Sequence, residues 1–236
     1  MTRVLAFPSP DELGRKLATE ILAAYGRTDG PFLLGCPGGR SLRTTYRALA
    51  ASAPALPRLV AVLMDEYAGA TVDDHFSCRR FAEEELAGPL GLREDQVWLP
   101  DESDPAAYDE RIAAAGGIGL FLLASGASDG HVAFVPPGSR RDGATALVEL
   151  AESTRRDNLA TFPGFTALAE VPRRGVSVGL GTIAGARSLR LVMHGGDKRA
   201  AAARLLALDR HDPEWPASIV HEHADAEIWL DAKALP

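Results

Sequence analysis

Residues 119–134, with the sequence GLFLLASGASDGHVAF, decide the fold class of this chain. The apolar run Leu120 to Ala124 predicts a strand that is buried on both faces, as in a parallel sheet. A loop of small residues follows the run and carries Asp129 and His131. Because ligands of open α/β sheets bind at the carboxyl ends of strands, this loop is a candidate site. A polar turn with one solvated histidine is the alternative that the stretch alone leaves open.

Apolar runs on both sides of this stretch predict more strands, with helices between them. Ser9 predicts the start of the first helix, because its side chain can cap the helix, Pro10 suits the first turn and Glu12 completes a capping box. The alternation predicts one domain over residues 1–236, an α/β, three-layer, Rossmann-like domain with a mostly parallel central sheet. Further strands are expected at 4–7, 32–36, 59–64, 176–180, 189–194 and 228–230, with a short one within 91–99, and helices at 10–26, 42–50, 73–86, 104–115 and from 195 onward.

Residues 134–165 form the longest stretch without a clear period. They contain prolines, glycines and many polar side chains, and they are expected to be largely irregular. A long irregular region inside a compact domain usually carries function or covers a site.

Composition narrows the classes of partner. The chain has 236 residues, 46% of them hydrophobic, and a net charge of −7, which suits one sizeable domain and argues against nucleic acid or an anionic membrane as partner. A small anionic substrate remains compatible, because a few clustered basic side chains can hold it. Cys36 and Cys78 suggest no disulfide or zinc framework, residues 1–7 lack the features of a signal peptide, and no apolar run approaches the length of a membrane span. A cytoplasmic protein is expected, and a homo-oligomer is compatible with these features.

A glycine-rich loop follows the predicted strand 32–36. Gly38 and Gly39 would let the backbone approach a phosphate closely, and the amides at the start of the next helix favour an anion. Ser41 adds a hydroxyl, and Arg40 or the nearby second arginine, at position 43, adds a positive charge. The loop fits neither the P-loop lysine pattern nor GxGxxG, so by itself it indicates a phosphate site only weakly.

A second loop of the same kind, residues 195–198, follows the predicted strand 189–194 and reads Gly-Gly-Asp-Lys. Lys198 falls in the first turn of a helix, where the helix dipole disfavours a cation. An anion bound by both the lysine and the free amides would explain that position. The alternative is an exposed lysine with a small energetic cost.

The apolar run 59–64 ends on an Asp-Glu-Tyr sequence that begins at Asp65. A carboxylate directly after a buried strand suits general acid–base chemistry, because partial burial raises its pKa towards neutrality. The alternative is that Asp65 only caps the next turn.

His221 and His223 form a weak metal motif, since they are two residues apart without further spaced ligands. We therefore expect no metal site.

Several of these segments, in this order, resemble the glucosamine-6-phosphate deaminase family. They are residues 35–49 (GCPGGRSLRTTYRAL), 64–67 (MDEY) and 129–134 (DGHVAF), and residues 178–182 and 195–198 match further family segments. Close relatives of that family are the galactosamine-6-phosphate isomerases, with the 6-phosphogluconolactonases more distant. The resemblance covers nearly the whole chain and is specific for the superfamily rather than for one reaction.

The resemblance implies a role for five side chains. Asp65 would be the base that moves a proton between sugar carbons 1 and 2. His131, with Asp129 beside it, would open the pyranose ring, and Ser41 and Lys198 would contact the substrate phosphate. A phosphorylated sugar is then the expected partner, and no cofactor is required.

The chain also departs from the family pattern. Residues 135–137 are Val-Pro-Pro where the deaminases have Asn-Glu-Pro, so Pro136 replaces a glutamate that forms a relay with the histidine. Ala160 occupies the position of a phosphate-binding arginine, and the first glycine loop reads Gly-Gly-Arg where Thr-Gly-Gly is usual. Arg40 or Arg43 is expected to supply the missing positive charge. These departures predict an altered catalytic site and an altered anion pocket.

Four functions follow as hypotheses. The first is isomerisation and deamination of a hexosamine 6-phosphate, which the Asp-Glu-Tyr and His-Val-Ala-Phe segments favour. The second is lactone hydrolysis, favoured by the missing relay glutamate but opposed by the absence of the lactonase segments Thr-Ala-Ser and Asp-Glu-Arg. The third is aldose–ketose isomerisation of a different sugar, and the fourth is a sugar-phosphate-binding protein without turnover.

Overall fold

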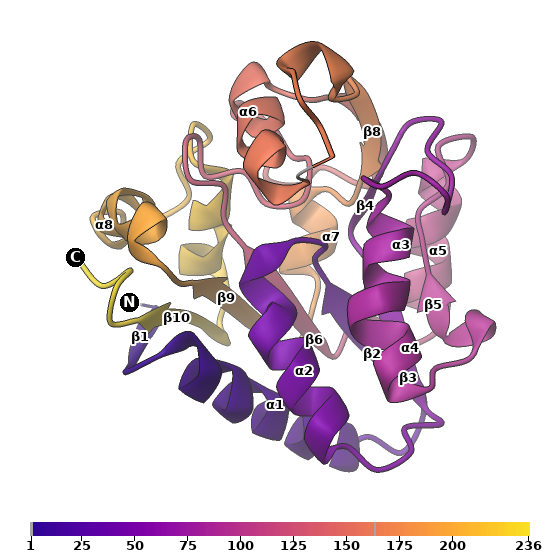
Figure 1. The fold of residues 1–236 in the computed structure, drawn as a ribbon. Helices are drawn as coiled ribbons and strands as arrows, with labels where there is room; N and C mark the ends of the chain where they lie inside the picture. Colours follow the sequence, from indigo (N-terminus) through magenta and orange to yellow (C-terminus); the bar gives the residue numbers. More distant parts are fainter. Residues whose placement is uncertain (1, 163) are drawn as a thin grey trace.

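The central element of the computed structural model, which describes residues 2–162 and 164–236, is a seven-stranded sheet (Figure 1). Every pair of neighbouring strands in it is parallel. The expected α/β class and parallel sheet are therefore confirmed. In spatial order the strands are β1 (Arg3–Phe7), β10 (Ala226–Asp231), β9 (Leu189–Met193), β6 (Leu120–Ala124), β2 (Phe32–Cys36), β3 (Leu59–Leu63) and β5 (Val97–Trp98).

Helices cover both faces of this sheet. Strand β6 shows why: Leu120 and Leu122 pack into one apolar cluster, whereas Phe121 and Leu123 pack into another on the opposite face. Because side chains alternate along a strand, a run that is apolar at every position needs a helical layer on each side. One face is covered by α1 (Pro10–Gly26), α2 (Arg43–Ser52) and α3 (Cys78–Ala82), and the other by α5 (Pro105–Ala114), α7 (Leu180–Ala184) and α8 (Arg199–Leu206).

The first helix starts where its sequence predicts. The Ser9 side chain accepts a hydrogen bond from the Glu12 amide at 3.2 Å, and Pro10 occupies the first turn. Leu13, Leu17 and Ile21 share one face and are fully buried. The remaining short helical segments are Arg40–Leu42, Glu83–Ala87, α4 (Gly88–Leu90), Glu94–Gln96, Leu168–Glu170, Gly196–Lys198 and Pro216–Glu222.

A second, antiparallel sheet of three strands was not expected. It consists of β4 (Asp65–Tyr67), β8 (Arg174–Ser177) and β7 (Ala146–Glu149), with β8 in the centre. The Asp-Glu-Tyr sequence is thus a strand of its own rather than the end of β3. The strand expected at 176–180 also ends earlier, because Gly179 packs against the backbone of Gly143 and the helix α7 begins one residue later.

The expectation of irregular structure over residues 134–165 is wrong for residues 146–161, which contain β7 and the helix α6 (Glu152–Thr161). The buried positions of α6 are Thr154, Arg155 and Asn158. A helix that buries polar side chains has no apolar period, so its sequence resembles that of a loop. Pro163, within the loop expected at 162–165, lies outside the described residues.

The helix expected at 73–86 starts later, at Cys78. Ser77 is its cap and accepts a hydrogen bond from the Arg80 amide at 3.2 Å, while Asp74 binds the amide and hydroxyl of Thr71 in the preceding turn.

Among the described residues, no helix combines the length and the apolar character needed to cross a bilayer.

Candidate active site

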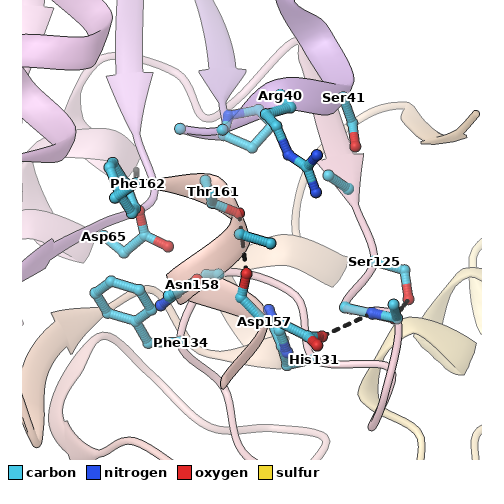
Figure 2. Close-up of a pocket in the computed structure, with 18 of the residues that line it drawn as sticks. Arg40, Ser41, Asp65, Ser125, His131, Phe134, Asp157, Asn158, Thr161 and Phe162 are labelled. Atoms are coloured by element: carbon cyan, nitrogen blue, oxygen red, sulfur yellow. Dashed lines mark hydrogen bonds between the residues drawn. The ribbon is translucent and has the colours of Figure 1, made fainter. Parts of the chain in front are cut away.

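A cavity of about 200 Å³ lies at the carboxyl edge of the main sheet, and residues of α6 form part of its wall (Figure 2). This is where parallel strands of an α/β fold expose their loops to a ligand. The loops after β2, β3, β6 and β9 therefore meet in one place. They and α6 contribute residues 37–41, 64–65, 124–127, 131, 133–134, 156–158, 160–162 and 197–198 to the lining, together with Cys78.

Asp65 is the carboxyl group of the cavity wall whose pKa is raised. It is only 6% exposed, and burial raises its pKa to about 7. The neighbouring charge of Glu66 adds to the increase, while a hydrogen bond from Cys78 and the proximity of His131 oppose it. A carboxyl group with a pKa near neutrality can take up and release a proton at physiological pH.

Glu66, next to Asp65 in the chain, has a different position and does not line the cavity. Its carboxylate accepts hydrogen bonds from the amides of Tyr67, Cys78 and Arg79 and from the hydroxyl of Ser77, at 2.8–3.0 Å. These bonds fix the first turn of α3 against β4 and thereby place Cys78 beside Asp65. Glu66 is therefore a structural anchor of the site.

His131 faces the cavity, and Asp129 lies behind it. The Nδ1 atom of His131 is 2.6 Å from Oδ1 of Asp129, whose Oδ2 accepts hydrogen bonds from Ser153 and Thr154 at 2.5 and 2.9 Å. Burial alone would raise the pKa of Asp129, but these hydrogen bonds and the charge of His131 outweigh it and hold the pKa below its usual range. An ionised carboxylate can only accept, so Nδ1 carries a proton and Nε2 is left for a ligand.

Two glycines make this arrangement sterically possible. A Cβ atom at Gly126 would lie 2.2 Å from Nδ1 of His131, and one at Gly130 would lie 2.3 Å from the ring of Trp215. Gly130 also has a φ of +67°, in the left-handed region that glycine tolerates best. The histidine–aspartate pair therefore requires glycine at position 126, and the packing of Trp215 requires it at position 130.

The opposite end of the cavity is basic. Lys198 donates a hydrogen bond to the carbonyl of Ser125 at 2.8 Å, and Arg40 lies 3.9 Å from Asp197. Burial lowers the pKa of Lys198, although the charges of Asp157 and Asp197 counteract this effect. The carbonyl of Ser41 contacts a ring nitrogen of His194 at 3.1 Å, which ties the two glycine loops together.

Most of the side chains singled out from the sequence thus surround one cavity. In Figure 2, Asp65 and His131 lie on one side of it and Arg40 and Ser41 on the other. Gly38, Gly39 and Lys198 also line it. Asp129 reaches the cavity only through His131. Arg43 points elsewhere: its Nε atom lies 3.1 Å from Glu85, and its guanidinium lies 5.2 Å from the Phe81 ring centroid.

Sequence reasoning missed the contribution of α6. Asn158 donates a hydrogen bond to the Tyr67 hydroxyl at 2.6 Å, and Asp157 projects into the cavity near His131 (Figure 2). Ala160 also lines the cavity. The available signal was the pair Ser153 and Thr154, whose hydroxyls suit the start of a helix, but no apolar period supported it.

Within the described part of the chain, one group of side chains has the composition of a metal site. The group consists of Asp129, His131 and Asp157, and one possible ligand atom of each lies within 4.8 Å of the other two. The Nδ1 atom of His131 is already bound by Asp129, so the arrangement fits a hydrogen-bonded imidazole better than a set of three free ligands.

Comparisons with known proteins identify relatives of this chain. The family model described as glucosamine-6-phosphate isomerases/6-phosphogluconolactonase matches residues 8–229. The chain is 33% identical to glucosamine-6-phosphate deaminase of Shouchella clausii, over 85% of this chain and 83% of the relative. It is 34% identical to the deaminase of Pseudarthrobacter chlorophenolicus, over 93% and 86% respectively.

Solved structures show the same relationship. A monomeric glucosamine-6-phosphate deaminase superposes with a TM-score of 0.89 at 25% identity, over 98% of both chains. A 6-phosphogluconolactonase from Thermotoga maritima superposes with a TM-score of 0.75 at 20% identity, over 98% of this chain and 99% of the other, and shares the fold. The chain therefore belongs to the glucosamine-6-phosphate isomerase/6-phosphogluconolactonase family.

Proposed function

We propose that this protein converts a hexosamine 6-phosphate, either glucosamine or galactosamine 6-phosphate, into a ketose phosphate and ammonia. The observation that carries the proposal is the shared cavity of Asp65, with its pKa raised to about 7, and His131. The reaction needs one group that moves a proton between carbons and another that moves protons between oxygens. The deaminase names of the relatives in two of the comparisons support the same assignment.

The basic end of the cavity is the proposed seat of the phosphate. Lys198 and Arg40 provide positive charge, and the Ser41 hydroxyl and the amides of the Gly38–Gly39 loop provide donors. A phosphate held there would direct the sugar ring towards the acid–base end. The lower pKa that burial imposes on Lys198 would be reversed by a bound dianion.

Ring opening is the first step of the proposed reaction. The Nε2 atom of His131 exchanges a proton with the sugar ring oxygen while Asp129 holds the imidazole by Nδ1. The bond between C1 and the ring oxygen breaks, the hydroxyl on C1 gives up a proton that replaces the one His131 delivered, and C1 becomes an aldehyde carbon. Asp129 keeps its charge throughout, because its pKa is depressed.

Proton transfer between carbons is the second step. The Asp65 carboxylate removes the proton from C2 and returns it to C1. Meanwhile the nitrogen loses a proton and O1 gains one, so the 2-amino aldehyde becomes a 2-imine with a hydroxyl on C1. Water then adds to the imine carbon, and ammonia leaves with the formation of the ketone. Burial favours the neutral acid that carries the proton between the two carbons.

Lactone hydrolysis is a second candidate, for one specific reason. The Asp129–His131 pair faces the cavity, and a histidine held in this way can deprotonate an attacking water without help from Asp65. The lactonase neighbours show that the fold accommodates such a protein.

One panel of assays tests the proposal. The protein is offered glucosamine 6-phosphate, galactosamine 6-phosphate, 6-phosphogluconolactone and plain hexose phosphates, and ammonia, ketose and lactone hydrolysis are measured. Ammonia release that Asp65→Asn abolishes is the expected result. Lactone hydrolysis that survives Asp65→Asn but not His131→Ala would replace the proposal by the second candidate, and tight binding without turnover of any compound would refute both.

A further inference from the structure

The cavity holds a carboxylate, that of Asp157, for which the proposed steps give no role. Asp157 lies on α6, one turn after Ser153 and Thr154, which bind Asp129. One of its oxygen atoms lies within 4.8 Å of a ring nitrogen of His131. Asp157 lines the cavity, whereas Asp129 does not, so Asp157 is the carboxylate beside His131 that a ligand can reach (Figure 2).

The carboxylate of Asp157 is held in position by the loop after β6. Its Oδ2 atom accepts hydrogen bonds from the amides of Ala127 and Ser128 at 2.8 and 3.2 Å, and its Oδ1 atom accepts one from the Ser128 hydroxyl. No arginine or lysine of the described chain forms an ion pair with it. The group is therefore held in place without a direct ion pair, and Lys198 is the cation on which its charge acts.

Opening a pyranose ring requires two proton transfers: the hydroxyl on C1 loses a proton, and the ring oxygen gains one. His131 has a single free nitrogen, because Asp129 occupies Nδ1. Of the other carboxylates in the cavity wall, Asp197 lies near Arg40 at the basic end, and Asp65 serves the carbon atoms in the proposed reaction. Asp157 is the remaining acid–base group, and it lies next to the imidazole.

We infer that Asp157 is a catalytic residue of ring opening, the partner that accepts the proton of the C1 hydroxyl. The inference rests on the proposed function. The imidazolium of His131 gives its Nε2 proton to the ring oxygen, the bond from C1 to that oxygen breaks, and the C1–O1 double bond forms. The O1 proton passes to an oxygen of Asp157 and then returns to Nε2 of His131, so that both groups regain their starting state.

Ring opening can be measured separately from the carbon chemistry. In an Asp65→Asn background the sugar cannot isomerise, but the α and β anomers of glucosamine 6-phosphate can still exchange through the open chain. Magnetisation-transfer NMR reports the rate of this exchange. Asp65→Asn alone is expected to accelerate the exchange above the rate without enzyme, and adding Asp157→Asn is expected to remove about 10²-fold of the acceleration, in the range of a general acid–base group.

Two further variants separate catalysis from support of the loop. Asparagine preserves the size of Asp157 and can still accept from the Ala127 and Ser128 amides, whereas glutamate preserves the basic oxygen but not the fit. A catalytic role predicts that Asp157→Glu exchanges anomers faster than Asp157→Asn, and a purely structural role predicts the reverse order. Glu149→Gln, which removes an exposed carboxylate of β7 outside the cavity lining, is the control and should leave the rate unchanged.

The outcomes also distinguish this inference from the proposed function. Asp157 is not the partner if the double variant Asp65→Asn/Asp157→Asn exchanges anomers as fast as Asp65→Asn alone. The same holds if Asp157→Asn exchanges anomers faster than Asp157→Glu. Both conclusions are independent of whether the wild type releases ammonia. If the wild type releases neither ammonia nor ketose but accelerates anomer exchange in a way that depends on Asp157, the proposed deamination fails and the assignment of Asp157 stands. If Asp65→Asn does not accelerate anomer exchange, the assignment of Asp157 fails, and ammonia release by the wild type decides the proposed deamination independently.

Discussion

Asp65 and Asp129 are two buried aspartates of one site with opposite electrostatic surroundings. Asp65 is buried beside a second carboxylate, and its pKa rises to about 7. Asp129 is equally hidden from solvent, but it accepts hydrogen bonds from His131, Ser153 and Thr154, and its pKa falls. The comparison teaches that burial alone does not determine the charge of a carboxyl group, because the donors around it decide which protonation state is favoured.

Of the changes that test this comparison, Asp65→Asn should have the largest effect on activity. The variant keeps the shape of the side chain but cannot move a proton, so ammonia release should fall by about 10³-fold or more. The raised pKa means that charging Asp65 destabilises the folded state as pH rises from about 4 to 7, and so the variant should melt at a higher temperature than the wild type at pH 8. A thermal scan and an ammonia assay check both; a stabilised variant with full activity would exclude Asp65 as the base.

Asp129→Asn should reduce activity by about 10²-fold and also lower stability. The asparagine amide cannot accept at both of its terminal atoms, so it would leave a hydroxyl donor of α6 unpaired and loosen the orientation of His131. Because the native pKa is depressed, the charged form stabilises the fold above the ordinary carboxyl range, and this contribution is lost as pH falls towards the depressed value. The free energy of unfolding at pH 7 should fall by about 1–3 kcal/mol; denaturant titration at pH 7 provides the measurement, and an unchanged midpoint would contradict the assigned hydrogen bonds.

The pH dependence of wild-type kcat/KM should separate the two aspartates, with a smaller effect than either substitution. Since Asp65 must be ionised to remove a proton from carbon, kcat/KM should fall about tenfold per pH unit below pH 7. Asp129 should add no step near neutrality, because its pKa is lowered. A profile between pH 5.5 and 8.5 with no limb near pH 7 would remove Asp65 from the role of base.

The smallest expected effect concerns the basic end of the cavity. Lys198→Ala and Arg40→Ala should each raise KM for phosphorylated sugars by about tenfold, the loss of one hydrogen bond to a charged group, with little change in kcat. Arg43→Ala, whose side chain contacts Glu85 and Phe81 outside the cavity, is the matched control. An Arg43→Ala variant that raises KM as much as Arg40→Ala would show that the arginine at position 43 moves into the site.

Sequence reasoning succeeded where a local pattern has one physical cause. The strands β2 and β6 were predicted with the observed bounds, because an apolar residue at every position requires helices on both faces. The start of α1 at Pro10 was predicted from its cap. Once the strands were parallel, the loops carrying Arg40, His131 and Lys198 had to meet at one edge of the sheet.

Prediction failed where stability depends on distant partners. Strand β4 is short, and it pairs with β8 more than 100 residues later in the chain. Helix α6 buries a threonine, an arginine and an asparagine whose hydrogen-bond partners lie on other elements, as Thr154 shows with Asp129 and Asn158 with Tyr67. Polar burial of this kind leaves no periodic signal in the sequence.

The sequence by itself determined the α/β class and the edge of the sheet at which the site lies, because local hydrophobic patterns and chain order suffice for both. Only the tertiary structure decided the environment of each acid: that Asp65 is desolvated, that Asp129 is surrounded by donors, and that Asp157 lies beside His131 although 26 positions separate them. The physical reason is that the charge state of a carboxyl group depends on the water and donors within a few ångströms of it, and folding brings those from distant parts of the chain.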